Sequence, residues 1–116
     1  MTLLEVKELL RAESHSVCDL SKCEVTAACG ADLLSDVLAF TKEQVLLLTG
    51  LVHPQVIRTA EMLDLAGIVF VRGKIPSPEM IELAEKKEIP IMSTSYPMFK
   101  SCGLLYEAGI QGDICD

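Results

Sequence analysis

Three apolar runs in this chain are each followed at once by polar side chains whose types could bind an anion. Thr49 follows the first run, Arg72 the second, and Ser93 with Thr94 the third. An arginine can hold a phosphate or a carboxylate with two parallel hydrogen bonds, which a lysine cannot reproduce. The sequence therefore predicts a binding site for a small anion near Thr49, Arg72, Ser93 and Thr94.

A histidine and a polar group on one helical turn are further candidates for ligand contact. His53 precedes Pro54, where it could cap a helix, titrate or contact a ligand. Asp32, Ser35 and Asp36 lie on one turn of another predicted helix, and the two carboxylates are four residues apart and adjacent on its surface. Capping of that helix accounts for Asp32. Asp36 has no comparable structural role, so we expect it near a cation, a partner's arginine or the ligand.

Phosphate-binding and catalytic motifs are missing from the sequence. It contains neither Gly-x-Gly-x-x-Gly nor Gly-x4-Gly-Lys-Ser/Thr. The nearest substitutes are Thr49-Gly50 and Arg72-Gly73-Lys74, each of which places a glycine and a polar side chain before a helix N-terminus that attracts anions. The same glycines could simply end strands and start turns. No serine, histidine or cysteine has neighbours that would activate it, so we predict binding without catalysis.

The three runs and the stretches after them predict consecutive βα units. The runs begin at residues 45, 68 and 89, which are 23 and then 21 residues apart, and Pro54, Pro78 and Pro97 open the helical stretches that follow. This spacing fits a strand plus a three-turn helix, the crossover that parallel strands require. We therefore predict one layered α/β domain over residues 1–116, with a mainly parallel sheet and helices on both faces. In such sheets, ligands bind beyond the carboxyl ends of the strands.

The amino-terminal part is expected to begin with an amphipathic helix. Thr2 and Glu5 fit a capping box, and the helix should run to about Ala12. After it we predict a loop with one short strand near residues 17–18. His15 is expected to be solvated in this loop.

The middle and the end of the chain complete the predicted domain. Residues 24–28 are predicted as a strand, and the last helix is expected to span residues 97–108. Residues 110–116 are predicted as a short acidic tail. The helix after Gly30 is expected to bury Leu33, Leu34, Val37 and Leu38.

Composition indicates a globular domain that associates with itself. Half of the residues are hydrophobic, none is Trp, and the mean hydropathy is +0.38. Such an apolar surplus on a small domain suggests a patch closed by a second copy, so we predict a homodimer. The net charge of -7 and the lack of a segment that clusters Lys or Arg with aromatic residues argue against nucleic-acid binding. No apolar run approaches the ~20 residues of a membrane span, and no signal peptide is recognisable, so we expect a cytoplasmic protein.

The spacing of the five cysteines does not indicate a metal centre. Their odd number argues against a disulfide framework, and the spacing lacks the Cys-x2-Cys pair of zinc sites. We predict no metal and no cofactor, with Cys102 in the core and Cys115 the most exposed. The cysteines are Cys18, Cys23, Cys29, Cys102 and Cys115.

Strings spread over nearly the whole chain resemble the DRTGG domain family, in particular its stand-alone members. The most specific are Asp-Leu-Leu-Ser-Asp from residue 32 and Leu-Tyr-Glu-Ala-Gly from residue 105. The resemblance implies an α/β domain that forms dimers and regulates, while another domain is the catalyst. Relatives of this kind adjoin CBS domains in regulated pyrophosphatases and the catalytic part of phosphotransacetylases, and the amino-terminal domain of HPr kinase is similar.

The chain departs from this family in two places. The literal Asp-Arg-Thr-Gly-Gly string is absent, and Gln55 stands where close relatives carry Asn. Ligand contacts of the family near these positions are therefore not carried over. The chain also lacks a P-loop, so similarity to HPr kinase does not imply kinase activity.

These observations favour two functions over an enzymatic one. One is a non-enzymatic, homodimeric regulatory module that senses a small anionic metabolite or a nucleotide at the strand ends. The other is an interaction domain that docks a partner enzyme or a signalling kinase and binds no small ligand.

Overall fold

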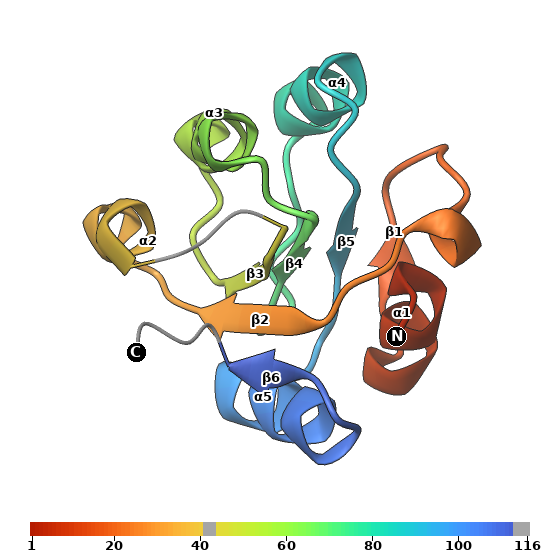
Figure 1. Cartoon of the computed structure of the whole chain (residues 1–116). Helices are drawn as coiled ribbons and strands as arrows, with labels where there is room; N and C mark the ends of the chain where they lie inside the picture. Colours follow the sequence, from red (N-terminus) through yellow and green to blue (C-terminus); the bar gives the residue numbers. More distant parts are fainter. Residues whose placement is uncertain (41–43, 113–116) are drawn as a thin grey trace.

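The fold is built on one sheet, whose central strands are parallel. The structure is a computed structural model and describes residues 1–40 and 44–112. Within these residues the sheet has six strands in the order β1-β5-β4-β3-β2-β6. All neighbours are parallel except β1, which is antiparallel to β5 (Figure 1). The strands are β1 Glu13–Ser14, β2 Ala27–Gly30, β3 Leu46–Thr49, β4 Gly67–Phe70, β5 Ile91–Ser93 and β6 Gln111–Gly112.

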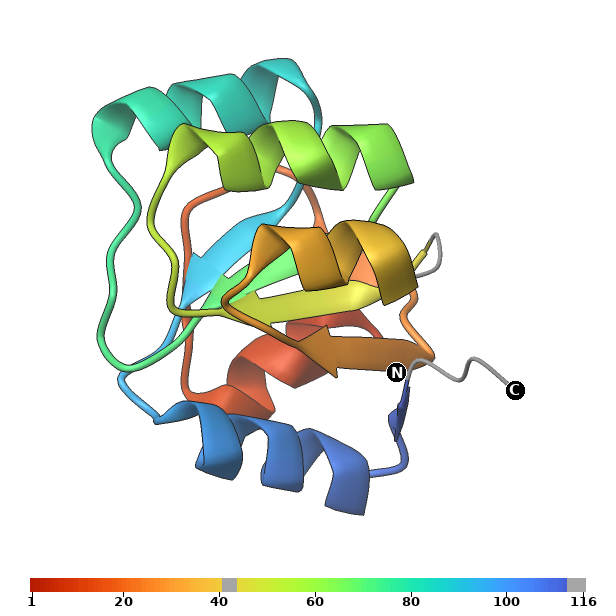
Figure 2. The ribbon, with the colours of Figure 1, turned by 90° about the vertical axis from the view of Figure 1, so that its left-hand side faces the viewer.

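Helices cover both faces of the sheet, as predicted. Figure 2 shows α2, α3 and α4 on one face and α1 with α5 on the other. The helices are α1 Leu3–Leu10, α2 Leu34–Phe40, α3 Pro54–Leu63, α4 Pro78–Lys86 and α5 Met98–Glu107, with the 3-10 turn η1 at Leu20–Lys22. The fold class of the sequence prediction, a layered α/β domain with a mainly parallel sheet, is confirmed.

The alternation of side chains along the buried strands produces two cores. On β3, Leu46 and Leu48 face α1 and α5, whereas Leu47 faces α3 and α4. All residues of β3 and β4 are buried, because helices lie on both faces of these strands. The central strands are therefore rigidly held, and the loops at their ends start from fixed points.

Local signals place the starts of three helices where the sequence predicts them. The capping box of α1 is present, with Thr2 and Glu5 each accepting from the other's backbone N–H. Helices α3 and α4 begin at Pro54 and Pro78, since a proline loses no hydrogen bond at the first helical position. The side chain of Ser77 caps α4 by accepting from the backbone N–H of Met80.

Several boundaries differ from the prediction because tertiary contacts decide them. Helix α1 ends at Leu10, where Arg11 turns left-handed with φ 50°. The short strand lies at Glu13–Ser14, where it pairs with β5, and Val17 is 86% exposed. The strand predicted at residues 24–28 begins at Ala27, in register with β3.

Helix α2 buries less than expected. Of the four apolar side chains predicted to point inward, only Val37 is fully buried, while Leu33 and Leu38 are exposed. The helix covers only the end of its layer, where α3 is the neighbouring helix (Figure 2).

The carboxyl-terminal stretch is partly structured. Gln111–Gly112 forms β6 in the stretch that we expected to be a tail, and it pairs in parallel with β2. Residues 113–116, which include Cys115, lie outside the described residues.

Candidate functional site

The loops that leave β2, β3, β4 and β5 lie side by side at one edge of the sheet. Backbone hydrogen bonds join the loops after β2 and β4 to the end of β3: Ala31 N–H donates to Leu48 O (3.0 Å) and Val71 N–H to Thr49 O (3.0 Å). The loop after β4 continues the ladder, since Gly73 N–H donates to Thr94 O (2.9 Å). Loops far apart in the sequence therefore form a continuous surface at the carboxyl ends of the strands.

The carboxylate of Asp32 links three of these segments. Its Oδ1 accepts hydrogen bonds from the backbone N–H of Gly50 (2.7 Å) and from the hydroxyl of Thr49 (3.3 Å). Its Oδ2 forms an ion pair with Nη2 of Arg72 (3.2 Å). Asp32 thus bridges the ends of β2, β3 and β4, which corrects the prediction that it serves mainly as a helix cap.

The guanidinium of Arg72 lies directly over the Gly50 backbone. A Cβ atom added to Gly50 would overlap Nη2 of Arg72, so only glycine leaves room for this placement. The backbone of Arg72 is left-handed, with φ 61°, and its N–H donates to Tyr96 O (2.8 Å). The side chains of Arg72 and Asp32 are each 49% exposed, so solvent or a ligand can reach both charges.

Thr49 supports the Asp32–Arg72 pair although its own side chain is not exposed to solvent. It is completely buried, and its hydroxyl accepts from Leu51 N–H (3.1 Å) while donating to Asp32. Its role is to hold the carboxylate and the loop after β3 in place.

His53 caps α3, which is the structural alternative considered for it. Its Nδ1 accepts from the backbone N–H of Gln55 (3.0 Å). The ring is exposed at the start of α3, on the loop that follows β3. A cap uses one ring nitrogen and leaves the other available to a ligand.

Ser93 and Thr94 point into the protein. The hydroxyl of Ser93 lies 2.8 Å from Nε2 of His15, and the two groups share a hydrogen bond. The hydroxyl of Thr94 donates to Leu10 O (2.7 Å) and accepts from Tyr96 N–H (3.1 Å). Both residues are buried and tie β5 to the amino-terminal segment, so His15 is bonded to β5 where the sequence prediction has it solvated.

Ser35 and Asp36 stand apart from the Asp32–Arg72 pair. Both are exposed on α2, and the structure records no side-chain hydrogen bond or ion pair for either within the described residues. The cation expected near Asp36 is not among its recorded contacts. Of the eight predicted site residues, the structure brings Thr49 and Arg72 into direct contact with Asp32.

An apolar cavity beside α5 is a feature that the sequence did not reveal. It has a volume of about 370 Å³ and lies between α5 and the β2–β6 edge of the sheet. Burial, and secondly the neighbouring Cys29, raises the pKa of the Cys102 thiol that lines it, which makes this cysteine a poor nucleophile. The sequence signal was absent because the cavity requires β6, which lies in the stretch expected to be a tail.

The described residues show neither a metal-binding cluster nor a membrane-spanning helix. In residues 1–40 and 44–112, no three His, Cys, Asp or Glu side chains are grouped so that they could hold a metal ion. No helix of this part of the chain has both the length and the apolar character needed to cross a bilayer.

Comparison with known proteins supports the fold. No protein-family model matches the chain, and no curated protein matches it. It is similar to the crystal structure of the CBS and DRTGG domains of the regulatory region of Clostridium perfringens pyrophosphatase, complexed with the activator diadenosine tetraphosphate. The TM-score is 0.73 at 19% identity, and the match covers 94% of this chain and 47% of that chain.

This similarity defines the class of domain. The chain has a DRTGG-like α/β fold, and the predicted resemblance is confirmed at the level of the fold. The chain spans about half the length of the solved regulatory region.

Proposed function

We propose that this chain is a non-enzymatic regulatory module, homodimeric, which senses a small anionic metabolite or a nucleotide at the carboxyl ends of its parallel strands. The observation that carries the proposal is the half-exposed Arg72 guanidinium, positioned by Asp32 over Gly50 where the strand-end loops meet. Open α/β sheets bind their ligands at this edge.

The chemistry of the pair favours a ligand with two kinds of group. Arg72 offers N–H donors to a phosphate or carboxylate, and the oxygens of Asp32 accept from hydroxyl or amino groups. The amino-terminal ends of α2, α3 and α4 follow the same loops and attract negative charge. A nucleotide carries a phosphate and donor groups in one molecule, so it suits this site better than a simple anion.

The structural relative is consistent with this class of ligand. It is described as a regulatory region in complex with an activating dinucleotide. Its regulatory role supports a module of this kind here.

A thermal-shift experiment tests the proposal. The protein is heated with AMP, ATP, diadenosine tetraphosphate or inorganic phosphate, each over a range of concentrations. A ligand at 100 times its dissociation constant adds ~2.7 kcal/mol, which corresponds to roughly 10 °C for a domain of this size. We expect at least one nucleotide to give a saturable shift.

Variants of two arginines make the test specific. Arg72→Ala should abolish the nucleotide shift, because the guanidinium that would contact the phosphate is gone. Arg58→Ala is the matched control, since Arg58 is an exposed arginine within α3, and it should retain the shift. Equal binding by the Arg72→Ala protein would refute the site.

The interaction domain remains the second candidate, on a separate observation. Three apolar side chains of the strand-end loops are exposed near the proposed site: Leu33, Val52 and Ile75. They could contact a partner enzyme or a signalling kinase. Two results together would favour this function. None of the nucleotides would give a saturable thermal shift. In addition, the Leu33→Asp protein would fail to bind a partner that the Arg72→Ala protein still binds.

A further inference from the structure

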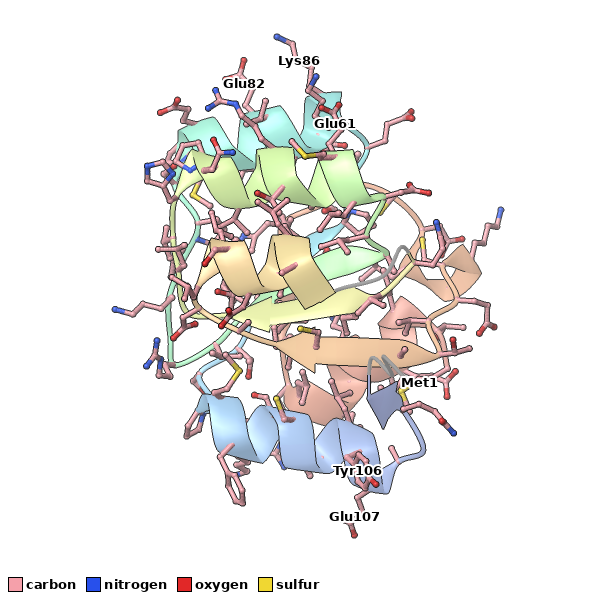
Figure 3. The ribbon with its side chains drawn as sticks, turned by 60° about the vertical axis from the view of Figure 1, so that its left-hand side comes forward. Met1, Glu61, Glu82, Lys86, Tyr106 and Glu107 are labelled. Atoms are coloured by element: carbon pink, nitrogen blue, oxygen red, sulfur yellow. The ribbon has the colours of Figure 1, made fainter. Side chains whose placement is uncertain are left out.

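The outer face of α5 is apolar and uncovered. Phe99 is 91% exposed and Tyr106 is 75% exposed, although both are large side chains. On the opposite side of the helix, Ser101 and Leu105 are buried against the sheet. Figure 3 shows Tyr106 with Glu107 at the lower margin of the molecule, on the outer side of α5. Aromatic side chains dominate the energetics of interfaces, so this face is suited to contact another protein.

The same face contains a hollow beside its protruding side chains. The cavity of about 370 Å³ is lined by Phe99, Cys102 and Tyr106 of α5 and by β2 and β6. Three glycines help to form its walls, namely Gly30, Gly103 and Gly112. A protruding aromatic ring and an apolar hollow thus lie next to each other on one surface.

We propose that this face binds a second copy of the chain, with the two α5 helices antiparallel and crossing near Gly103. A Cβ atom at Gly103 would have no atom within 4 Å, so the helix surface is open there and a second backbone can approach closely. In a two-fold contact each surface must complement itself. Phe99 of each chain then enters the hollow of the other.

The charges on α5 favour a second copy of the chain as the partner. Lys100 lies three residues before Gly103 and Glu107 lies four residues after it, on the same flank of the helix. In an antiparallel pair centred at Gly103, Lys100 of one chain therefore faces Glu107 of the other, and the pair occurs twice. In a parallel two-fold pair, by contrast, the copies of this flank lie on opposite sides of the contact, so Lys100 of one chain does not face Glu107 of the other. Lys100 is already directed by its contact with Tyr96, whose ring centroid lies 4.0 Å from Nζ.

This inference rests on the homodimer in the proposed function and adds its surface. Its test uses no ligand, so failure here leaves the proposal for Arg72 intact. Equally, loss of nucleotide binding would not alter the dimer.

Exchanging the two charges tests the arrangement by sedimentation equilibrium. The wild-type protein should be dimeric at micromolar concentration. Lys100→Glu and Glu107→Lys should each raise the dissociation constant about tenfold, because each creates two like-charge pairs. The double variant should return to the wild-type value.

Mixing the two single variants gives a sharper result. In the heterodimer, Glu at position 100 faces Lys at position 107, and Lys100 faces Glu107, so every pair is again of opposite charge. We expect a heterodimer that is about tenfold tighter than either variant alone. A wild-type protein that stays monomeric at ~100 μM, or a double variant no tighter than the single ones, would overturn the proposal.

A pair of aspartate variants distinguishes loss of the interface from the general effect of adding a charge to an exposed apolar position. Phe99→Asp should dissociate the dimer, whereas Met62→Asp on α3 should not, since Met62 is also an exposed apolar residue (69%) but lies on the other face of the sheet. Circular dichroism should show that both variants remain folded, because neither side chain is in the core. Dissociation by both variants, or by neither, would contradict the assignment.

Discussion

The side chain of Arg72 contributes little to the stability of the fold. Its ion pair with Asp32 is half-exposed, and surface pairs of this kind contribute only about 0–1 kcal/mol. Asp32 contributes more to the structure, because it also accepts the short hydrogen bond from Gly50 N–H (2.7 Å). The arginine can therefore be removed with small cost to the fold, whereas the aspartate cannot. This difference makes Arg72→Ala a clean test of binding.

The buried hydroxyl of Ser101 makes no hydrogen bond within the described residues. The residue is fully buried on α5, and its Oγ has no hydrogen-bond partner among the described residues. An unpaired buried hydroxyl costs about 1–3 kcal/mol, and alanine is the better helix former. We predict that Ser101→Ala raises the free energy of unfolding by about 1 kcal/mol, as measured by urea denaturation.

Thr94 provides the contrasting case for the same measurement. Its buried hydroxyl donates to Leu10 O and accepts from Tyr96 N–H. Thr94→Val should therefore lower the free energy of unfolding by about 1–3 kcal/mol. If Ser101→Ala were as destabilising as Thr94→Val, the hydroxyl of Ser101 would have to be bonded after all.

At the scale of single elements, the start of α1 depends on the charge of a carboxylate. Glu5 accepts from the backbone N–H of Thr2 (3.1 Å) and from its hydroxyl (3.2 Å). The backbone bond first, and then the hydroxyl bond, lower the pKa of Glu5 below its ordinary value of 4.5. Because the carboxylate form is favoured in the folded state, its contribution to stability is present above pH 4.5 and is lost as the pH falls through the lowered pKa.

A pH series with a Glu5 variant measures this contribution. Glu5→Gln should make the free energy of unfolding less dependent on pH on the acid side of about pH 4.5, because the variant cannot lose a charge there. Glu8→Gln, on the exposed side of the same helix, is the control and should retain the wild-type acid slope. An unchanged slope in Glu5→Gln would mean that the capping box does not form in solution.

Over the whole molecule, stability should decrease from the centre of the sheet to its edges. β3 and β4 are buried throughout and lie in the middle of the strand order, while the edge strands β1 and β6 have two residues each. Short edge strands offer little backbone for unwanted pairing with other chains.

Hydrogen exchange followed by mass spectrometry measures this gradient. Amides of Leu46–Thr49 and Gly67–Phe70 should exchange most slowly, through global unfolding. Amides of Gln111–Gly112 should exchange by local opening, at least an order of magnitude faster. Protection of β6 as strong as that of β3 would show that something covers this edge in solution, and comparison with Phe99→Asp would establish whether the dimer does so.

The sequence by itself determined the βα units and the edge where their loops meet. Runs of apolar residues predict buried strands, and prolines and serines start helices through contacts within one turn, so tertiary structure is not needed to recognise them. Once the strands are known to be parallel, their carboxyl ends must lie at one edge. The placement of Thr49 and Arg72 at the same edge follows from this rule.

Only the tertiary structure decided which side chains at that edge face outward and what each one contacts. Ser93 ends β5 and Thr94 follows it, near the edge where Arg72 follows β4. Both nevertheless turn inward, because their partners, His15 and Leu10, lie on the amino-terminal segment beside β5. Asp32 bridges to Arg72, 40 residues away, because β2, β3 and β4 are neighbours in the sheet. The hollow beside α5 exists because the chain returns as β6 next to β2. These outcomes depend on the order of the strands in the sheet. Hydrophobic patterning does not encode that order, because all buried strands have similar runs of apolar residues.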